Sequence, residues 1–317
     1  MRVHPLVVAL TALLLPITLT ACGGAVAART PSDAVSAAPS ATAPDRTYAV
    51  GVRTLDLTHG RDRPLPVTVW YPARPTTPRP SGPAPTRDAP MAAGRFPVVL
   101  FSHGLHSLPE MHAPLTSRWA AAGFVVAAPA YPHTKWRTPR FDRADIRRQP
   151  GDARWVLNLL RLLNQRVGDR FAGRLAMDRV AAAGHSAGGY TTAGLFAPGH
   201  PAWLRGGIVI SGGGMPGVTY GGPAAPQLFL HGDADRVVPP ARGWAAYHQV
   251  PWPKAFLRLA GQGHGEFLTP GRPGFERVVQ VTTHFLRWVL HGDPDALAAL
   301  RAAARSPDVA EFADLLG

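Results

Sequence analysis

The sequence has a single cysteine, Cys22, and only two lysines, Lys135 and Lys254. One cysteine cannot form a disulfide within the chain, and it excludes a metal site built from several cysteine ligands. The apolar N-terminal stretch, Leu6–Ala21, is shorter than the about 20 residues that a membrane-spanning helix needs, and it contains Pro16. Its length is typical of the core of a signal peptide.

The composition is otherwise that of a folded protein with many loops. Hydrophobic residues make up 46% of the 317 residues and charged residues 17%, so a sizeable core can form. This length allows one large domain or two small ones. The 33 glycines and 34 prolines predict long connections rather than a helical bundle.

Positive charge exceeds negative charge, with a formal net charge of +13. The arginines are spread singly along the chain, and the tightest group lies in Arg137–Arg148. No zinc-finger, ribonucleoprotein or basic-zipper pattern accompanies them. A solvated basic surface that tolerates anionic lipid or cell wall is therefore favoured over a nucleic-acid partner.

The N-terminal stretch ends in Leu19-Thr20-Ala21-Cys22, which resembles the bacterial lipobox, where the cysteine is lipidated and becomes the mature N-terminus. The alternative is an ordinary secretory signal with an incidental cysteine. The resemblance implies a lipoprotein signal peptide at 1–21 and a lipid-modified Cys22. It also implies a secreted protein held by acyl chains on the outer face of the cell membrane. Residues 22–46, rich in Ala, Ser, Pro and Thr, are expected to form a disordered tether, and 47–317 the catalytic domain.

From residue 47 onward, strand and helix patterns alternate. An antiparallel pair of strands is expected at 48–57 and 65–71, and a proline-rich exposed loop at 73–96. The alternation that follows predicts an α/β fold with a mostly parallel central sheet and helices on both faces. Residues 293–317 are expected to form one or two short helices. Further strands are expected at 98–101, 124–128, 180–183, 208–210, 227–230 and 255–259, and helices at 115–122, 152–163, 187–195 and 275–290.

The sequence Gly184-His185-Ser186-Ala187-Gly188 has the form Gly-x-Ser-x-Gly. It directly follows a predicted strand and directly precedes a predicted helix. This is the setting of a nucleophile elbow, a sharp strand-to-helix turn that exposes a serine. The alternative, a glycine-rich turn with a surface serine, does not account for the placement. Ser186 is therefore the candidate nucleophile.

A serine nucleophile needs a base and an orienting carboxylate, which follow a nucleophile elbow in the order acid, then histidine. After the strand at 227–230 come Asp233 and Asp235, and after the strand at 255–259 comes His264 between two glycines. Asp235 is favoured as the acid, while Asp233 remains an alternative that can also cap a turn. His264 is favoured as the base, because no other downstream histidine lies on a suitable loop.

Two backbone N–H groups must stabilise the negative charge that develops on the attacked carbonyl oxygen. The residue after the nucleophile, Ala187, is expected to supply one. Leu105, in the loop after the strand at 98–101, is expected to supply the other. His103, His106 and His112 lie nearby, but their spacing fits no zinc pattern, so no metal site is predicted.

These residues resemble the α/β-hydrolase superfamily. The stretches 63–72 and 96–104 are similar to bacterial proteins related to platelet-activating-factor acetylhydrolase and dienelactone hydrolase, and the similarity covers Tyr48 to Leu290. It implies the α/β-hydrolase fold and hydrolysis of carboxylic esters, short-chain or phospholipid-like, through an acyl-enzyme and with no cofactor. It assigns Ser186, Asp235 and His264 as the catalytic triad, and Leu105 and Ala187 as oxyanion donors. Dienelactone hydrolases themselves use a cysteine nucleophile.

Two other functions remain open. Polyesterases of the cutinase type share this layout, although they often have an aromatic residue at the position of Leu105 and methionine at that of Ala187. A lipid-anchored binding protein that kept the fold and lost activity is the other alternative. A small-molecule or lipid ester is the expected substrate, and no protein partner can be inferred. The segment Tyr131–Gln149 is expected either to meet an anionic or interfacial substrate or to be a solvated basic loop.

Overall fold

The computed structural model describes residues 47–75 and 85–317. The predicted signal peptide at 1–21, Cys22 and the tether at 22–46 lie outside the described residues and stay predictions. No helix within the described part of the chain is long and apolar enough to cross a membrane.

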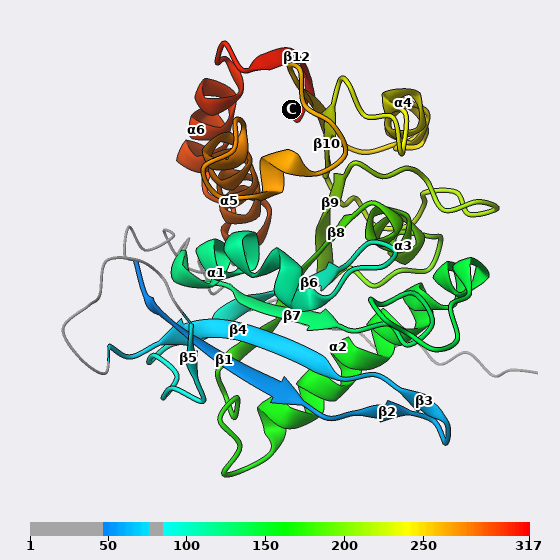
Figure 1. Ribbon diagram of the computed structural model, residues 1–317. Helices are drawn as coiled ribbons and strands as arrows, with labels where there is room; N and C mark the ends of the chain where they lie inside the picture. The colour runs from blue at the N-terminus through cyan, green and yellow to red at the C-terminus, as the bar shows by residue number, and fades with distance from the viewer. Residues whose placement is uncertain (1–46, 76–84) are drawn as a thin grey trace, which may run out of the picture. The chain divides into compact units, whose positions relative to one another are not determined.

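A ten-stranded sheet forms the centre of the described part of the chain (Figure 1). Its strand order is β12-β11-β10-β9-β8-β6-β7-β4-β1-β5. The strands from β7 to β11 in this order are parallel, while β4, β1 and β12 join antiparallel to their inner neighbours. The strands are β1 Ala49–Leu55, β4 Val67–Ala73, β5 Thr86–Arg87, β6 Phe96–Ser102, β7 Val125–Pro129, β8 Leu175–His185, β9 Leu204–Ile210, β10 Gln227–Gly232, β11 Lys254–Leu259 and β12 Val309–Leu315, with a separate hairpin of β2 Thr58–His59 and β3 Arg63–Pro64.

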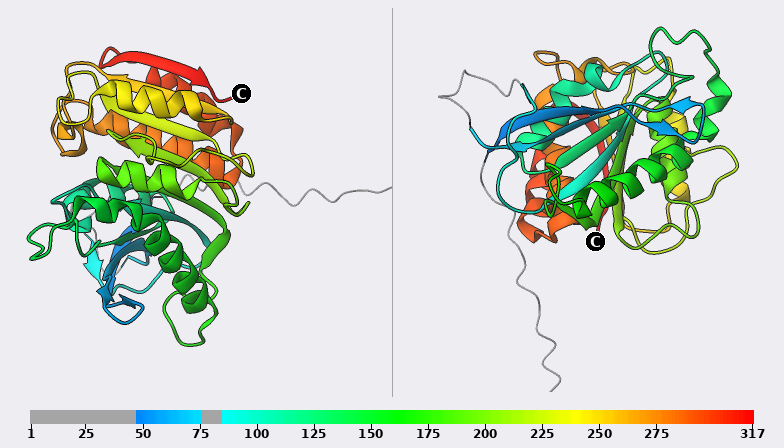
Figure 2. Two further views of the ribbon diagram at one scale, coloured as in Figure 1. Left: turned by 90° about the vertical axis from the view of Figure 1, so that its right-hand side faces the viewer. Right: turned by 90° about the horizontal axis from the view of Figure 1, so that it is seen from below.

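Helices cover both faces of the sheet, and their apolar sides build separate cores. The helices α1, α5 and α6 pack on one face and α2, α3 and α4 on the other, as the left view of Figure 2 shows with yellow α4 in front and the orange helices behind. The helices are α1 Ala113–Ala121, α2 Gln149–Gln165, α3 Ala187–Leu195, α4 Pro240–Gln249, α5 Phe275–His291 and α6 Pro294–Ala304, with short 3-10 helices η1 Pro109–His112, η2 Arg143–Arg147 and η3 Glu266–Leu268.

This architecture confirms the predicted fold class: a mostly parallel sheet with helices on both faces, entered through an antiparallel pair. The strands of that pair, β1 and β4, align from Ala49 with Ala73 to Leu55 with Val67. The central strand β6 is entirely buried, as its continuous apolar run predicts. The carboxyl ends of β6, β8, β10 and β11 therefore meet along one edge of the sheet, where open α/β sheets bind ligands.

The prediction for residues 293–317 is partly wrong. Helix α6 is present, but the chain then forms β12, which pairs antiparallel with β11. The sequence of β12, Val-Ala-Glu-Phe-Ala-Asp-Leu, does not alternate between apolar and polar residues, so it shows no strand period. Its conformation is set by pairing with a distant strand and by side-chain contacts such as Arg258 to Glu311 at 3.2 Å.

The prediction of an exposed loop at 73–96 is wrong in part. Most described residues of this segment are exposed, including Arg74 and Asp88. Thr86 and Arg87 form β5 beside β1, and Ala89, Met91 and Ala92 are buried. The Tyr71 hydroxyl donates a hydrogen bond of 2.8 Å to the Ala89 carbonyl, which draws this segment onto the core. Proline prevents long regular elements here, but it does not prevent burial.

Candidate active site

Ser186 lies at the sharp turn between β8 and α3, as the sequence predicts. It is the residue that caps the N-terminus of α3, and its backbone has φ 57° and ψ −119°. A non-glycine residue in such a conformation carries strain of about 1–3 kcal/mol, which surrounding contacts must offset. The Ser186 N–H contributes by donating 2.8 Å to the Ile210 carbonyl of the neighbouring strand. This backbone conformation directs the Ser186 side chain away from both β8 and α3.

The glycines on either side of Ser186 allow β8, α3 and β6 to approach closely. A Cβ at Gly184 would collide with the Gly188 carbonyl, and one at Gly188 would collide with the Ser102 carbonyl at the end of β6. Both collisions are with backbone, which cannot move aside. The Gly-x-Ser-x-Gly spacing is therefore a packing requirement of this turn as well as a signature of it.

The loop after β6 touches the serine. A Cβ at Gly104 would lie 3.0 Å from Ser186 Cβ and 3.5 Å from its Oγ, so this glycine leaves room for the hydroxyl. Leu105 follows it and lines the same pocket as Ser186 and Ala187. As the first residue of α3, Ala187 has an N–H without an acceptor inside the helix. Within the described residues, the Leu105 N–H also has no hydrogen-bond acceptor.

Asp235 and His264 are brought together from two neighbouring loops. His264 Nδ1 lies 2.8 Å from Asp235 Oδ2, while Asp235 Oδ1 accepts hydrogen bonds from the Val237 and Val238 N–H groups at 2.8 and 2.9 Å. Burial alone would raise the pKa of Asp235, but the bonds from His264 and from these backbone groups outweigh it and lower the pKa below its usual range. Asp235 is thus an anion that orients the imidazole.

Asp233, the alternative acid, has a different environment. Its Oδ1 accepts a hydrogen bond of 2.7 Å from the Gly261 N–H, which fixes the turn after β11. The carboxylate that contacts His264 is therefore that of Asp235.

His264 is positioned beside the elbow through the residue preceding the serine. His185 Nε2 lies 2.8 Å from the His264 carbonyl oxygen, and the two rings are 4.9 Å apart. Burial lowers the pKa of His185 to about 4, so it is neutral and donates this bond through Nε2–H. Within the described residues, no hydrogen bond joins Ser186 Oγ to the His264 ring. Such bonds are often long without substrate and tighten when it binds.

Two supporting histidines were not assigned a role from the sequence. His231 Nε2 donates 2.8 Å to the Val238 carbonyl and lies 3.2 Å from Asp235 Oδ2. His103 Nδ1 donates 2.7 Å to the Gly104 carbonyl, while its Nε2 accepts from the Tyr131 N–H at 3.1 Å. Burial lowers the pKa of His103 to about 4, so it braces the Gly104 loop as a neutral ring. Their positions at strand ends were the only sequence signal.

The three histidines considered as a metal cluster do not converge. His106 stacks on Phe141 at 4.2 Å, and His112 packs against Phe101 at 4.8 Å. Within the residues that the structure describes, no group of three His, Cys, Asp or Glu side chains is placed to hold a metal ion.

Ser186 opens onto a pocket of about 690 Å³. Its apolar wall includes Leu105, Ile146, Met215 and Val238. The volume is in the range of pockets that bind small organic molecules. Of the segment 131–149, only residues 143, 144, 146 and 147 line the pocket, so the predicted contact region narrows to η2.

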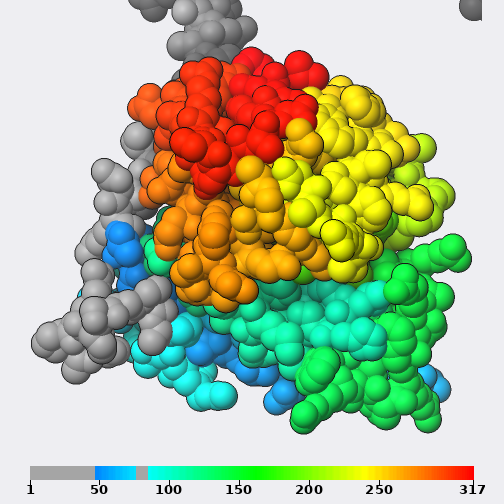
Figure 3. Space-filling model, turned by 45° about the horizontal axis from the view of Figure 1, so that its top comes forward, coloured from blue at the N-terminus to red at the C-terminus, as the bar shows by residue number. Residues whose placement is uncertain are grey.

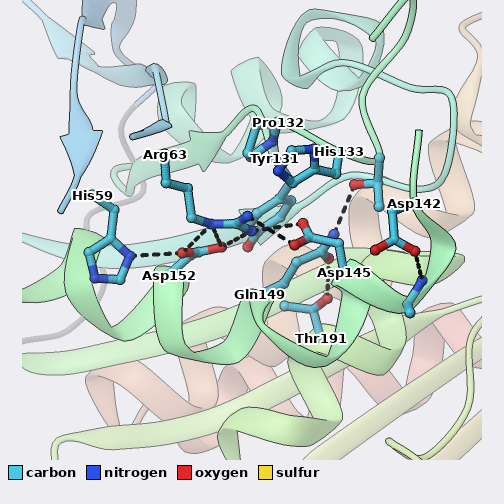
Figure 4. Close-up of polar contacts among 12 residues, drawn as sticks. His59, Arg63, Tyr131, Pro132, His133, Asp142, Asp145, Gln149, Asp152 and Thr191 are labelled. Atoms are coloured by element: carbon cyan, nitrogen blue, oxygen red, sulfur yellow. Dashed lines mark hydrogen bonds and ion pairs between the residues drawn. The ribbon is translucent and has the colours of Figure 1, made fainter. Parts of the chain in front are cut away.

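A buried ion network fixes η2 in place (Figure 4). Arg63 Nη1 and Nη2 donate to Asp145 in η2 at 2.9 and 2.7 Å, and its Nε and Nη2 donate to Asp152 in α2 at 2.9 and 2.6 Å. His59 adds a bond of 2.8 Å to Asp152. The three side chains of the Arg63 network are at most 7% exposed. The β2–β3 hairpin thereby anchors the pocket wall.

Replacing Arg63 with methionine is expected to lower the free energy of unfolding by about 3–5 kcal/mol, because the buried Asp145 would lose its cation and the buried Asp152 would keep only its bond to His59. Denaturant unfolding followed by circular dichroism measures the change. Arg95→Met is the matched control, since Arg95 and Asp178 form an exposed pair at 3.4 Å, worth about 0–1 kcal/mol. Equal effects of the two substitutions would contradict a structural role for the network.

The comparisons with known proteins agree with this fold. Residues 71–200 match the model of the chlorophyllase family, which is a family of the α/β-hydrolase superfamily. The protein has the α/β-hydrolase fold. The matched segment runs from β4 past α3, so it includes Leu105 and Ser186 and ends before Asp235 and His264. No curated protein shows significant similarity to the chain. The match therefore indicates a hydrolase of esters and leaves the substrate open.

Proposed function

We propose that the protein is a serine esterase that hydrolyses carboxylic esters through an acyl-enzyme, without a cofactor. The observation that carries the proposal is the hydrogen bond of 2.8 Å between Asp235 and His264, on a loop held against the residue before Ser186. An orienting carboxylate, an imidazole and a strained serine at one edge of the sheet are the parts that nucleophilic catalysis needs.

In the first half of the reaction, Ser186 Oγ attacks the carbonyl carbon of the ester while His264 Nε2 takes its proton. The N–H groups of Leu105 and Ala187 stabilise the oxyanion that forms. The tetrahedral intermediate then collapses, the C–O bond to the alcohol breaks, and His264 returns the proton to the leaving alcohol.

In the second half, a water molecule attacks the acyl group on Ser186 and gives a proton to His264. The second tetrahedral intermediate then collapses, the bond between the acyl carbon and Ser186 Oγ breaks, and His264 returns the proton to Oγ, which releases the carboxylic acid and restores the serine hydroxyl. The apolar pocket wall at Leu105, Ile146 and Met215 supports binding of the hydrocarbon part of the substrate.

A panel of p-nitrophenyl esters of increasing acyl length tests this function, together with a fluorophosphonate probe that modifies activated serines. We expect turnover of the panel and labelling of Ser186, located by mass spectrometry of peptides. A polyester film in the same panel separates simple esterase from polyesterase activity. A folded protein that neither turns over any ester nor reacts with the probe would favour the binding-protein alternative.

We further propose that Cys22 is lipidated and holds the enzyme on the outer face of the membrane, where a lipid or small-molecule ester is its substrate. This proposal depends on the lipobox-like residues 19–22 alone. Cys22→Ser in the full chain is expected to move the protein from the membrane fraction to the soluble fraction, since acyl chains supply the binding energy. Retention of that variant in the membrane fraction would contradict lipidation at this residue.

A further inference from the structure

Three arginines line the pocket of Ser186. Arg143 and Arg147 come from η2, and Arg242 comes from α4. In Figure 3, the green surface that includes η2 and the yellow surface that includes α4 lie on the same face of the molecule. All three arginines are exposed, and among the residues that the structure describes no carboxylate lines the pocket. Within the described residues, none of the three guanidinium groups has an ion-pair partner.

The nearest acidic residues in the sequence have other partners. The Asp145 carboxylate binds Arg63, Asp142 Oδ1 accepts from the Ala144 N–H at 2.8 Å, and Asp235 binds His264. Asp145 and Asp235 are thus paired with groups outside this set of arginines, and Asp142 does not line the pocket. The charge that remains available to a molecule in the pocket is positive.

The backbone that carries the two η2 arginines is held in place before any ligand arrives. Arg63 fixes Asp145, which lies between Arg143 and Arg147 in the same short helix (Figure 4). A guanidinium group on a fixed backbone loses less freedom when it binds an anion. Arginine also suits carboxylate and phosphate groups, because its planar fork donates two parallel hydrogen bonds.

We propose that the ester hydrolysed here carries an anionic group, which Arg143, Arg147 and Arg242 bind while the scissile carbonyl lies at Ser186. This inference rests on the proposed esterase function and narrows its substrate class. The apolar wall takes the hydrocarbon part of the molecule, and the three cations take a carboxylate or phosphate group on the acyl or on the alcohol side. A neutral ester would leave these cations paired only with solvent ions.

Matched substrates test the proposal in the enzyme as it exists. On the alcohol side they are 4-acetoxybenzoate, its neutral methyl ester and the cationic 4-acetoxy-N,N,N-trimethylanilinium. On the acyl side they are monophenyl adipate and neutral phenyl hexanoate. On at least one side, kcat/KM for the anion is expected to exceed that for the neutral ester about tenfold at low salt. This ratio should fall as ionic strength rises, because the arginines are exposed.

Variants then assign the preference to the pocket. Arg143→Gln/Arg147→Gln/Arg242→Gln should bring the anionic-to-neutral ratio close to one. The control is Arg61→Gln/Arg87→Gln/Arg305→Gln, which removes the same charge from exposed positions that do not line the pocket and should keep the ratio. Persistence of the preference in the pocket variant, or its equal loss in the control, would overturn the assignment.

The two proposals fail in different ways. Hydrolysis of the neutral and anionic esters at the same rate on both sides, with all turnover dependent on Ser186, would overturn the anionic substrate and keep the esterase. Absence of turnover for every ester in the set, with no fluorophosphonate labelling, would overturn the esterase itself.

Discussion

Ser186→Ala is expected to reduce kcat/KM for a p-nitrophenyl ester by about 10⁴- to 10⁶-fold and to abolish fluorophosphonate labelling, because it removes the only atom that forms the acyl-enzyme. Some acceleration over the uncatalysed reaction should remain, since the N–H groups of Leu105 and Ala187 would still bind a developing oxyanion. Initial rates with substrate below KM, corrected for spontaneous hydrolysis, measure the loss.

A second serine-to-alanine substitution controls for general damage. Ser117 is buried in α1 and does not line the pocket, so Ser117→Ala should keep kcat/KM within a few-fold of the parent. Far-ultraviolet circular dichroism of both variants establishes that they are folded. Parent-level turnover by folded Ser186→Ala would refute the proposed nucleophile.

Structural features that depend on residues close together in the sequence could be predicted. The turn at Ser186 is one such feature. The glycines that permit close backbone packing lie two residues before and after Ser186, and the strand and helix that create the turn directly precede and follow Ser186. The central parallel strands are another, since burial on both faces requires continuous apolar runs such as that of β6. The fold class follows from these local patterns.

The choice between Asp233 and Asp235 shows where sequence reasoning reaches its limit. Both carboxylates follow β10 and both can cap a turn. Only the folded chain shows that Asp233 bonds to the Gly261 N–H while Asp235 reaches His264. The difference depends on how the loops after β10 and β11 contact each other. No periodic pattern in the sequence indicates these contacts.

Contacts between distant segments could not be predicted at all. Arg63 binds Asp145 and Asp152, which lie more than eighty residues further along the chain. No pattern near Arg63 in the sequence indicates a buried partner. The same holds for β12, whose residues lack a clear period and become a strand by pairing with β11. In both cases the stabilising contacts join groups that lie far apart in the sequence.

The chlorophyllase-family match divides the site in an informative way. It includes Ser186 and the loop of Leu105, both positioned by the packing of β6 against β8, and it ends before the loops of Asp235 and His264. Two of the three pocket arginines, Arg143 and Arg147, fall inside the match, while Arg242 lies beyond it. The segments after residue 200 therefore contribute the proposed acid and base, and through Met215, Val238 and Arg242 they also form one wall of the pocket.

Asp235→Asn is expected to lower kcat by about 10⁴-fold, as removal of this charge does in comparable triads. In one orientation the new amide nitrogen faces His264 Nδ1 and can only donate a hydrogen bond to this atom. The imidazole proton then lies on Nε2, so Nε2 cannot accept a proton from Ser186. In the other orientation the nitrogen faces the N–H groups of Val237 and Val238, which also donate. Neither orientation reproduces the bonds of the carboxylate.

Asp233→Asn is the matched control, because it makes the same chemical change two residues away on the same loop. The amide oxygen can still accept from the Gly261 N–H, so kcat should stay within a few-fold of the parent. Steady-state kinetics of both variants on one ester decide between the two acids. A large loss in Asp233→Asn with a small one in Asp235→Asn would move the role to Asp233. Loss confined to Asp235→Asn would mean that the 2.8 Å contact with His264 orients the base during turnover.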